Sequence, residues 1–182
     1  MAAYLITGAT GLIGQALCQR LLNNGETVFA LSRNCQTAKK ILGSQVQCAE
    51  SVDELPANSH IDVVINLAGA PIVDKRWTED RKQKLLDSRV VYTQNLIQQL
   101  SKRPSLPHSL ISGSAVGWYG DQGDTVLTEN SGFKPEFSHE LCEQWEKAAL
   151  TAESLGMRVA IVRTGLVLAA KGGFLAKMKL PF

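Results

Sequence analysis

Short runs of apolar and β-branched residues alternate along the chain with longer amphipathic segments. The runs predict buried strands at positions 4–7, 27–31, 45–48, 61–67, 109–112 and 157–162. Apolar residues at every third or fourth position predict helices at 12–23, 37–42, 78–100 and 137–155. Because strands and helices alternate throughout, the pattern predicts an α/β fold with a doubly wound parallel sheet.

The predicted helices are expected to present apolar stripes to the sheet. In the first helix the stripe is formed by Ile13, Leu17 and Leu21, and in the last helix it includes Trp145. The segment 78–100 is longer than one sheet face needs, so its outer side is a candidate homodimer surface. A solvated outer face carrying lysines explains this pattern equally well.

The composition is that of an ordinary globular domain. Of the 182 residues, 45% are hydrophobic and 20% are charged, which is enough apolar material for a sizeable core. The formal net charge is +2 and the basic residues are scattered, so neither a nucleic acid nor a membrane is expected as a partner. The sequence shows no signal peptide and no apolar run long enough to span a bilayer, and we expect a cytoplasmic protein.

The four cysteines, Cys18, Cys35, Cys48 and Cys142, are far apart in the sequence and form no C-x-x-C pair. This spacing argues against a zinc site or a dithiol redox motif, and no metal site is expected. The sequence therefore predicts reduced, partly buried thiols.

A glycine-rich turn, TGATGLIG at 7–14, follows the first predicted strand and contains Gly8, Gly11 and Gly14. Backbone N–H groups at a helix N-terminus are unpaired and attract anions, and glycines let a pyrophosphate approach them closely. The spacing is one residue longer at its start than G-x-G-x-x-G, and a plain tight turn is the alternative. No Gly-Lys-Ser/Thr follows, which disfavours a P-loop. The position at the start of a βαβ unit favours dinucleotide binding.

Small and polar residues also follow the other predicted strands. The carboxyl ends of parallel strands meet at one edge of the sheet, where ligands bind, so we expect a groove there for a cofactor and a small-molecule substrate. The residues expected to bind the cofactor are Gly8, Thr10, Gly11, Leu12, Ile13, Gly14, Ser32, Arg33, Leu67, Ala68, Gly69, Arg89, Ser112 and Arg163.

The residues after the second predicted strand favour NADP(H) over NAD. An acidic residue at this place would hydrogen-bond the ribose 2′-OH of NAD, but the sequence has Ser32 and Arg33. Arg33 can pair bidentately with a 2′-phosphate and Ser32 can donate to it. A solvent-exposed arginine without a ligand is the alternative.

Several motifs together resemble the extended short-chain dehydrogenase/reductase superfamily. They are TGATGLIG at 7–14, NLAGAPI at 66–72, SGSAVGWYG at 112–120, LTENS at 127–131 and IVRTGLVL at 161–168. The sequence is also similar to its atypical epimerase-like branch, the nucleoside-diphosphate-sugar epimerases, in W-x-x-x-x-x-x-x-L-x-x-SR at 77–89, GWYGDQGD at 117–124 and C-x-x-WE at 142–146.

This resemblance implies an NADP-binding Rossmann domain at 1–168 and a C-terminal substrate-binding region that starts at 169–182. Such proteins continue well beyond this point, so we expect the chain to be truncated. Its last apolar residues would then lack their cover and expose hydrophobic surface.

The chain departs from this superfamily at its catalytic Tyr-x-x-x-Lys pair, in which the tyrosine donates a proton and the lysine lowers its pKa. Phe137 or Ser138 stands where the tyrosine is expected, and Leu141 or Cys142 where the lysine is expected. The usual hydride-transfer machinery is therefore absent or rebuilt.

Ser114 and Tyr119 are the candidate catalytic residues. Ser114 matches the superfamily's substrate-polarising Ser/Thr, with Ser112 as a near alternative; both are also plain strand-end hydroxyls. Tyr119 is a candidate substitute acid, although in relatives the tyrosine of this loop commonly lines the site without serving as the acid.

Three further side chains are considered for the site. His139 and Glu140 are available for catalysis, but an exposed early helical turn explains them better. Arg89 falls where relatives often hold an asparagine that orders the site, and it can pair with a phosphate-bearing substrate or cofactor. A salt bridge on the helix face is the alternative for Arg89.

The expected function is that of an NADP(H)-dependent oxidoreductase or epimerase-like enzyme acting on a nucleotide sugar or another small polar substrate. A non-catalytic NADP(H)-binding sensor or scaffold is the rival hypothesis, motivated by the missing Tyr-Lys pair.

Overall fold

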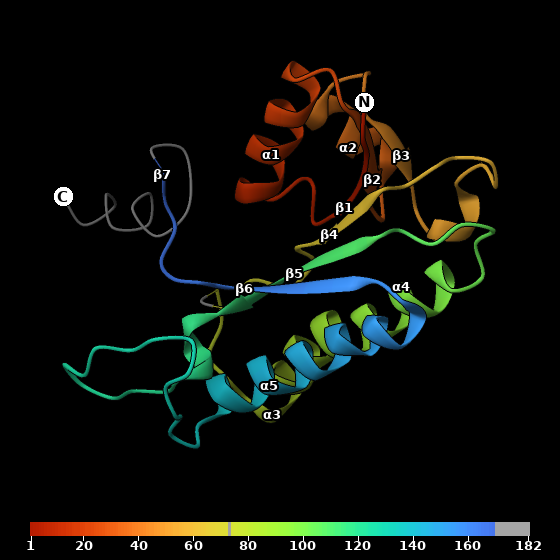
Figure 1. Ribbon diagram of the computed structural model, residues 1–182. Coiled ribbons are helices and arrows are strands. Elements are labelled where there is room, and N and C mark those ends of the chain that lie inside the picture. Colours follow the sequence, from red (N-terminus) through yellow and green to blue (C-terminus); the bar gives the residue numbers. More distant parts are fainter. Residues whose placement is uncertain (73, 170–182) are drawn as a thin grey trace, which may run out of the picture.

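The computed structural model describes residues 1–72 and 74–169, which form one sheet with helices on both faces (Figure 1). The strands are β1 (Ala3–Thr7), β2 (Thr27–Leu31), β3 (Gln47–Ala49), β4 (Val63–Asn66), β5 (Ser109–Ala115), β6 (Arg158–Thr164) and β7 (Leu168–Ala169). The longer helices are α1 (Leu12–Asn23), α2 (Cys35–Leu42), α3 (Glu79–Leu86), α4 (Tyr92–Leu100) and α5 (Phe137–Leu150). The short ones are the 3-10 helices η1 (Val52–Glu54), η3 (Val116–Trp118) and η4 (Thr151–Leu155) and the π-helix η2 (Asp87–Val91). The expected C-terminal region, 169–182, lies outside the described residues except for Ala169.

The six-stranded sheet has the order β3-β2-β1-β4-β5-β6, and each neighbouring pair is parallel. This arrangement confirms the predicted doubly wound α/β fold. The chain order reverses between β1 and β4, which are paired through Thr7 and Asn66 at their carboxyl ends. In such sheets this switch point is where ligands bind, so the topology places a crevice beside the β1–α1 loop.

Two hydrophobic clusters fill the spaces between the sheet and the helices on its two faces. Successive residues of β1 point to opposite faces, so that Leu5 packs with Leu100 of α4 and Ala149 of α5, whereas Ile6 packs with Cys18 of α1. Figure 1 shows the corresponding layers, with α1 and α2 on one side of the sheet and α3, α4 and α5 on the other. None of the helices in the described ranges is both long enough and apolar enough to cross a bilayer.

The apolar stripe of α1 differs from the prediction. Gly14, Cys18 and Leu21 are the buried residues of this helix, and Ile13 is 42% exposed. The reason is a close backbone contact, since a Cβ on Gly14 would lie 2.4 Å from the carbonyl oxygen of Gly8. The helix therefore turns its glycine face to the β1–α1 loop, and Ile13 is carried to the cavity side.

The predicted helix at 78–100 is interrupted by the π-helical turn η2. Its start is as predicted, because the Thr78 side chain caps α3 by accepting from the Arg81 N–H. The wider turn at 87–91 separates α3 from α4. Such turns often occur at functional sites, and this one contains Arg89.

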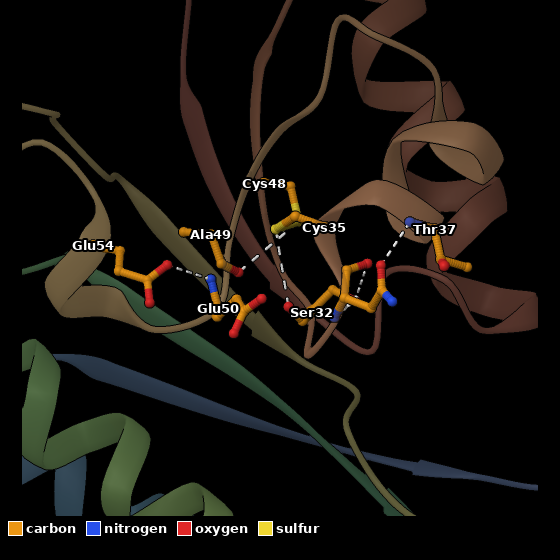
Figure 2. The surroundings of a disulfide bond; sticks show 8 residues. Ser32, Cys35, Thr37, Cys48, Ala49, Glu50 and Glu54 are labelled. Carbon is orange, nitrogen blue, oxygen red and sulfur yellow. Dashed lines mark hydrogen bonds between the residues drawn. A yellow bond between two sulfur atoms is a disulfide. The ribbon is translucent and has the colours of Figure 1, made fainter.

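The prediction of four free thiols is wrong for two of the cysteines. Cys35 and Cys48 are joined by a disulfide, with their Cα atoms 5.5 Å apart (Figure 2). The two cysteines meet because β3 pairs with β2 and therefore lies beside the start of α2, which follows β2. Their separation of 13 residues in the sequence does not indicate this contact. Cys18 and Cys142 are free and buried, as predicted.

Candidate functional site

A cavity of about 350 Å³ lies at the carboxyl edge of the sheet, at the switch point. It is bounded by the β1–α1 loop, the segment after β4, the turn η2, the end of β5, one face of α5 and the segment after β6. Its lining residues are Gly8, Gly11, Leu12, Ile13, Gly14, Leu67, Ile72, Arg89, Gly113, Ser114, Ala115, Leu141, Cys142, Trp145, Thr164, Gly165 and Val167. The cavity thus combines the glycine-rich turn at 7–14, called the glycine loop below, with residues of α5, the helix on which the catalytic Tyr-Lys pair is expected.

The glycine loop is shaped by contacts that leave no room for side chains. Gly8 has a φ of 66°, and a Cβ there would lie 2.6 Å from the carbonyl oxygen of Leu67. Gly11 caps α1, whose first turn contains no acidic residue. The N–H groups at this end of α1 therefore face the cavity edge without a negative side chain of the same helix to compete for them, which suits an anionic ligand.

Arg89 is a buried cation beside this loop. It is 7% exposed, and its guanidinium donates to the carbonyl oxygen of Ala70 at 3.0 Å and lies 5.3 Å from the ring centroid of Trp145. Gly69 makes room for it, since a Cβ there would lie 2.8 Å from Cζ of Arg89. Burial lowers the pKa of Arg89.

No carboxylate of the described residues forms an ion pair with Arg89, so the expected alternative of a helix-face salt bridge is not found. A buried charge is costly unless it has a partner. The guanidinium instead donates to the carbonyl oxygens of Ala70 and Leu85 and to the Ser88 hydroxyl, and Arg89 contributes a positive charge to the cavity lining.

A network of buried polar side chains holds the switch point together. The Thr7 hydroxyl donates to Oδ1 of Asn66 at 2.7 Å, and Nδ2 of Asn66 donates to the Thr93 hydroxyl at 2.8 Å. Nδ2 of Asn66 also lies 3.4 Å from Oγ of Ser112, whose side chain is fully buried. Ser112 is thus part of this structural network and does not line the cavity.

Ser114 reaches the cavity from β5 and is hydrogen-bonded to a charged pair behind it. Its hydroxyl donates to Oε1 of Glu146 on α5 at 2.6 Å. Both carboxylate oxygens of Glu146 accept from Arg163, at 2.9 Å from Nε and 2.8 Å from Nη2. The next nitrogen, Nη1 of Arg163, donates to the Tyr119 hydroxyl at 3.1 Å. Four side chains therefore form one continuous chain of hydrogen bonds that starts at the cavity.

The strand register explains why these groups meet. β5 and β6 run further than predicted, to Ala115 and Thr164, and they pair Ser114 with Arg163. The guanidinium of Arg163 is also stacked 3.8 Å from the ring centroid of Trp118, and its hydrogen bonds to Glu146 raise its pKa. This bidentate pairing gives the carboxylate of Glu146, which is only 8% exposed, a charged partner on both oxygens.

Ser114 therefore presents lone pairs to the cavity. A hydroxyl has one proton, and that of Ser114 is donated to Glu146. The oxygen is left as an acceptor for a donor on a ligand, such as a substrate hydroxyl. This polarity is opposite to that of a serine that donates to a substrate carbonyl.

The two positions expected for the catalytic lysine both line the cavity. They are Leu141 and Cys142, and burial raises the pKa of the Cys142 thiol, so this side chain is neutral near neutral pH. Phe137, one of the positions expected for the tyrosine, lines a different groove of about 690 Å³ between the starts of α3 and α5. The cavity thus has a neutral thiol and an aliphatic side chain where a lysine would act.

His139 also lines this second groove, and the expectation that it is exposed is wrong. It is 5% exposed, because its ring is stacked on Phe133 with the centroids 3.7 Å apart, and its Nδ1–H donates to the carbonyl oxygen of Trp118. The loop between η3 and α5 thus folds back over the first turn of α5 and covers His139.

Ser32 and Arg33 lie beside the switch point, on the connection from β2 to α2. The Ser32 N–H donates to the carbonyl oxygen of Ala49, and the exposed Arg33 follows it. Burial raises the pKa of Tyr92, the first residue of α4, and the positive charge of Arg33 partly opposes this increase.

The structure thus brings together part of the predicted set. Those in the cavity are Gly8, Gly11, Leu12, Ile13, Gly14, Leu67, Arg89 and Ser114, and those outside its lining are Thr10, Ser32, Arg33, Ala68, Gly69, Ser112, Tyr119 and Arg163. Sequence reasoning missed Glu146, although this acidic residue lies one turn after Cys142 on the apolar face of a predicted helix. A charged residue at such a position is a signal that it has a buried partner.

Comparisons with known proteins agree with this architecture. Residues 4–179 match the model of the NAD dependent epimerase/dehydratase family. An epimerase family protein of Staphylococcus aureus is 39% identical over 183 residues, which cover 100% of this chain and 61% of that protein. A Staphylococcus saprophyticus epimerase family protein is 39% identical over 185 residues, with the same coverage. The chain therefore spans about 61% of the length of these curated relatives.

Solved structures give the same result. The human epimerase family protein SDR39U1 (isoform 2), crystallised with NADPH, is 30% identical with a TM-score of 0.78 and is matched over 98% of this chain and 59% of that chain. A nucleoside-diphosphate sugar epimerase from Corynebacterium glutamicum is 32% identical with a TM-score of 0.79, over 98% of this chain and 37% of that chain. The UDP-glucuronic acid 4-epimerase of Bacillus cereus with NAD shares the fold, at 23% identity and a TM-score of 0.73 over 94% of this chain and 58% of that chain.

The family match extends over nearly the whole sequence, and the sheet order and glycine loop are those of a dinucleotide-binding fold. The chain belongs to the NAD dependent epimerase/dehydratase family.

Proposed function

We propose that this chain binds NADP(H) and that the protein is an epimerase or reductase acting on a nucleotide sugar or another small polar substrate. The observation that carries the proposal is one cavity that contains the glycine loop, the buried cation Arg89 and the acceptor Ser114. The glycine loop and Arg89 suit the anionic part of a dinucleotide, and Ser114 suits the reacting hydroxyl of a substrate.

The residues present fit an NADP(H) molecule. The glycine loop, where a Cβ on Gly8 or Gly14 would collide with backbone, suits the pyrophosphate, and Ser32 and Arg33 suit the 2′-phosphate. When bound, NADP(H) supplies the hydride acceptor or donor. The NADPH in the human relative supports this choice of cofactor, although the more distant Bacillus enzyme was crystallised with NAD.

Ser114 and Glu146 supply a route for a proton. As a substrate hydroxyl is oxidised, Oγ of Ser114 accepts its proton and passes its own proton to Oε1 of Glu146. The reverse transfer returns a proton to a carbonyl oxygen during reduction. Arg163 and Tyr119 position Glu146 and do not line the cavity.

We also propose that residues 1–168 form the cofactor-binding domain, because the six-stranded sheet and all residues that line the cavity lie within this range. The proposed substrate class is supported by the Corynebacterium relative, which is described as a nucleoside-diphosphate sugar epimerase.

The second candidate function is a non-catalytic NADP(H) sensor or scaffold. The observation that favours it is the pair of cavity positions occupied by Leu141 and Cys142, which provide no cation to lower the pKa of an acid. A sensor would bind the cofactor through the same glycine loop and transfer no hydride.

Two measurements test these alternatives. Cofactor binding is measured by the rise in melting temperature of the protein with NADPH and with NADH, since a ligand that binds only the folded state stabilises it. Hydride transfer is measured with C4-deuterated NADPH and UDP-sugar or carbonyl substrates. Ser114→Ala is expected to abolish transfer and retain NADPH binding.

Ser138→Ala is the matched control, because the Ser138 hydroxyl also donates to a glutamate, at 3.2 Å from Oε2 of Glu136, but outside the cavity. Absence of any NADPH-dependent thermal shift would refute the proposed function. Binding without deuterium transfer to any substrate, and unaffected by Ser114→Ala, would favour the sensor.

A further inference from the structure

The disulfide between Cys35 and Cys48 lies next to the loop that we propose for recognition of the 2′-phosphate. Cys35 is the first residue of α2, and Cys48 lies in the middle of the edge strand β3 (Figure 2). Only residues 32–34 separate Cys35 from the end of β2, so the disulfide closes the connection that contains Arg33. Both cysteines are half-buried and therefore more accessible to a small thiol than Cys18 and Cys142, which are buried.

The connection 32–34 is held at each end by β3. At its start the Ser32 N–H donates to the carbonyl oxygen of Ala49 at 3.0 Å, and at its end the disulfide fixes Cys35. Between these points the Asn34 side chain caps α2 by accepting from the Thr37 N–H at 2.9 Å. The backbone on both sides of Arg33 is thereby fixed.

Without the disulfide, α2 would be weakly anchored. It has eight residues, of which Ala38 alone is buried, and Leu42 packs partly against the core cluster under α1. Little apolar area is buried by such a helix, so a covalent bond provides a large part of its attachment. The strand that carries the other cysteine is itself only three residues long.

Arg33 is free to bind an anion. It is exposed, and in the described part of the chain its guanidinium forms no ion pair. The position of such a long side chain depends on the backbone that carries it. A fixed backbone lowers the entropy cost of placing the guanidinium against a phosphate.

We propose that Cys35 and Cys48 form a redox modification site that controls the affinity of the protein for the 2′-phosphate of NADP(H). The inference rests on the proposed binding of NADP(H). In the oxidised form the disulfide holds Arg33 at the cofactor. Two molecules of a small thiol such as glutathione reduce it: the sulfur–sulfur bond breaks, the cysteines gain two electrons and two protons as thiols, and the two reductant molecules leave joined as a disulfide.

The experiment compares dissociation constants for NADPH and NADH, measured by nicotinamide fluorescence, in the oxidised and in the reduced protein. Thiol counting by alkylation and mass spectrometry defines the two states. Reduction should weaken NADPH binding by about fivefold or more, a typical size for coupled sites, and change NADH binding less than twofold. NADH lacks the 2′-phosphate, so its unchanged affinity shows that the glycine loop is intact.

Two variants make the result specific. The double variant Cys35→Ser, Cys48→Ser should bind NADPH as weakly as the reduced protein, and reductant should have no further effect on it, which excludes Cys18 and Cys142. In Arg33→Ala the difference between oxidised and reduced protein should disappear.

The possible failures are distinguishable. An equal NADPH/NADH affinity ratio in the two redox states, with Arg33→Ala still lowering that ratio, overturns the redox inference and leaves the proposed cofactor in place. A parallel loss of NADPH and NADH affinity on reduction overturns it as well, since the disulfide would then support the whole fold. Lack of NADPH binding in both states removes the proposed function itself.

Discussion

Replacing Glu146 with alanine should destabilise the protein by about 2–3 kcal/mol. The change removes the acceptor of three hydrogen bonds, one from Ser114 and two from Arg163. Breaking a fully buried ion pair costs roughly 3–5 kcal/mol, because the remaining charge stays buried without a partner. The Arg163 side chain is 19% exposed and keeps its contacts with Trp118 and Tyr119, which reduces this cost.

The assay is urea unfolding followed by circular dichroism, with the free energy taken from the linear dependence on denaturant. Glu143→Ala is the control on the same helix, since Glu143 pairs with Lys147 at 2.9 Å on the surface, where the two side chains are 39% and 68% exposed. Surface pairs contribute about 0–1 kcal/mol, so this variant should unfold nearly as the wild type. If Glu146→Ala lowered the free energy of unfolding no more than Glu143→Ala, the Glu146–Arg163 pair would not stabilise the fold and our reasoning would be refuted.

Two further predictions concern backbone packing and pH. Gly14→Ala should lower the free energy of unfolding by about 1–3 kcal/mol, because the new Cβ would lie 2.4 Å from the carbonyl oxygen of Gly8. The control is Gly132→Ala, which should cost far less because no atom lies within 4 Å of the Cβ position there. Equal denaturation midpoints for the two variants would contradict the predicted clash at Gly14. The Ala3 N–H, 2.7 Å from Oδ2 of Asp62, holds the pKa of this carboxyl below its ordinary value, so its stabilisation is complete above about pH 4 and is lost as the pH falls through the lowered pKa. The stability difference between wild type and Asp62→Asn should therefore shrink on acidification, and a difference independent of pH would exclude this role.

The fold could be predicted from sequence because its signals are local. A buried parallel strand is a run of apolar residues, and each run at β1, β2 and β4 is followed by a helical period or a glycine. The glycine loop was found for the same reason, since strand, glycines and helix are contiguous. Residues 4–14 contain everything needed to predict this loop.

The contacts that were missed depend on registers between distant segments. Glu146 meets Ser114 and Arg163 only because β5 pairs with β6 in one register and α5 crosses above them. The disulfide likewise requires β3 to pair with β2. The spacing of apolar residues along the sequence predicts neither of these two contacts. The helical period predicts Ile13 in the core, because a period of 3.6 residues does not reveal that Gly14, which has no side chain, makes the closest backbone contact.

The π-helical turn at 87–91 makes the position of Arg89 sensitive to chain length more than to side-chain identity. One residue of an α-helix corresponds to a rotation of about 100°, so a single deletion within the turn would convert it to α-helix and rotate α3 relative to α4. Thr78 and the α3 residues that line the groove between α3 and α5 would then change position, although the identity of every remaining side chain was unchanged. A change in the length of this turn would therefore separate the buried cation Arg89 from the cavity that it lines.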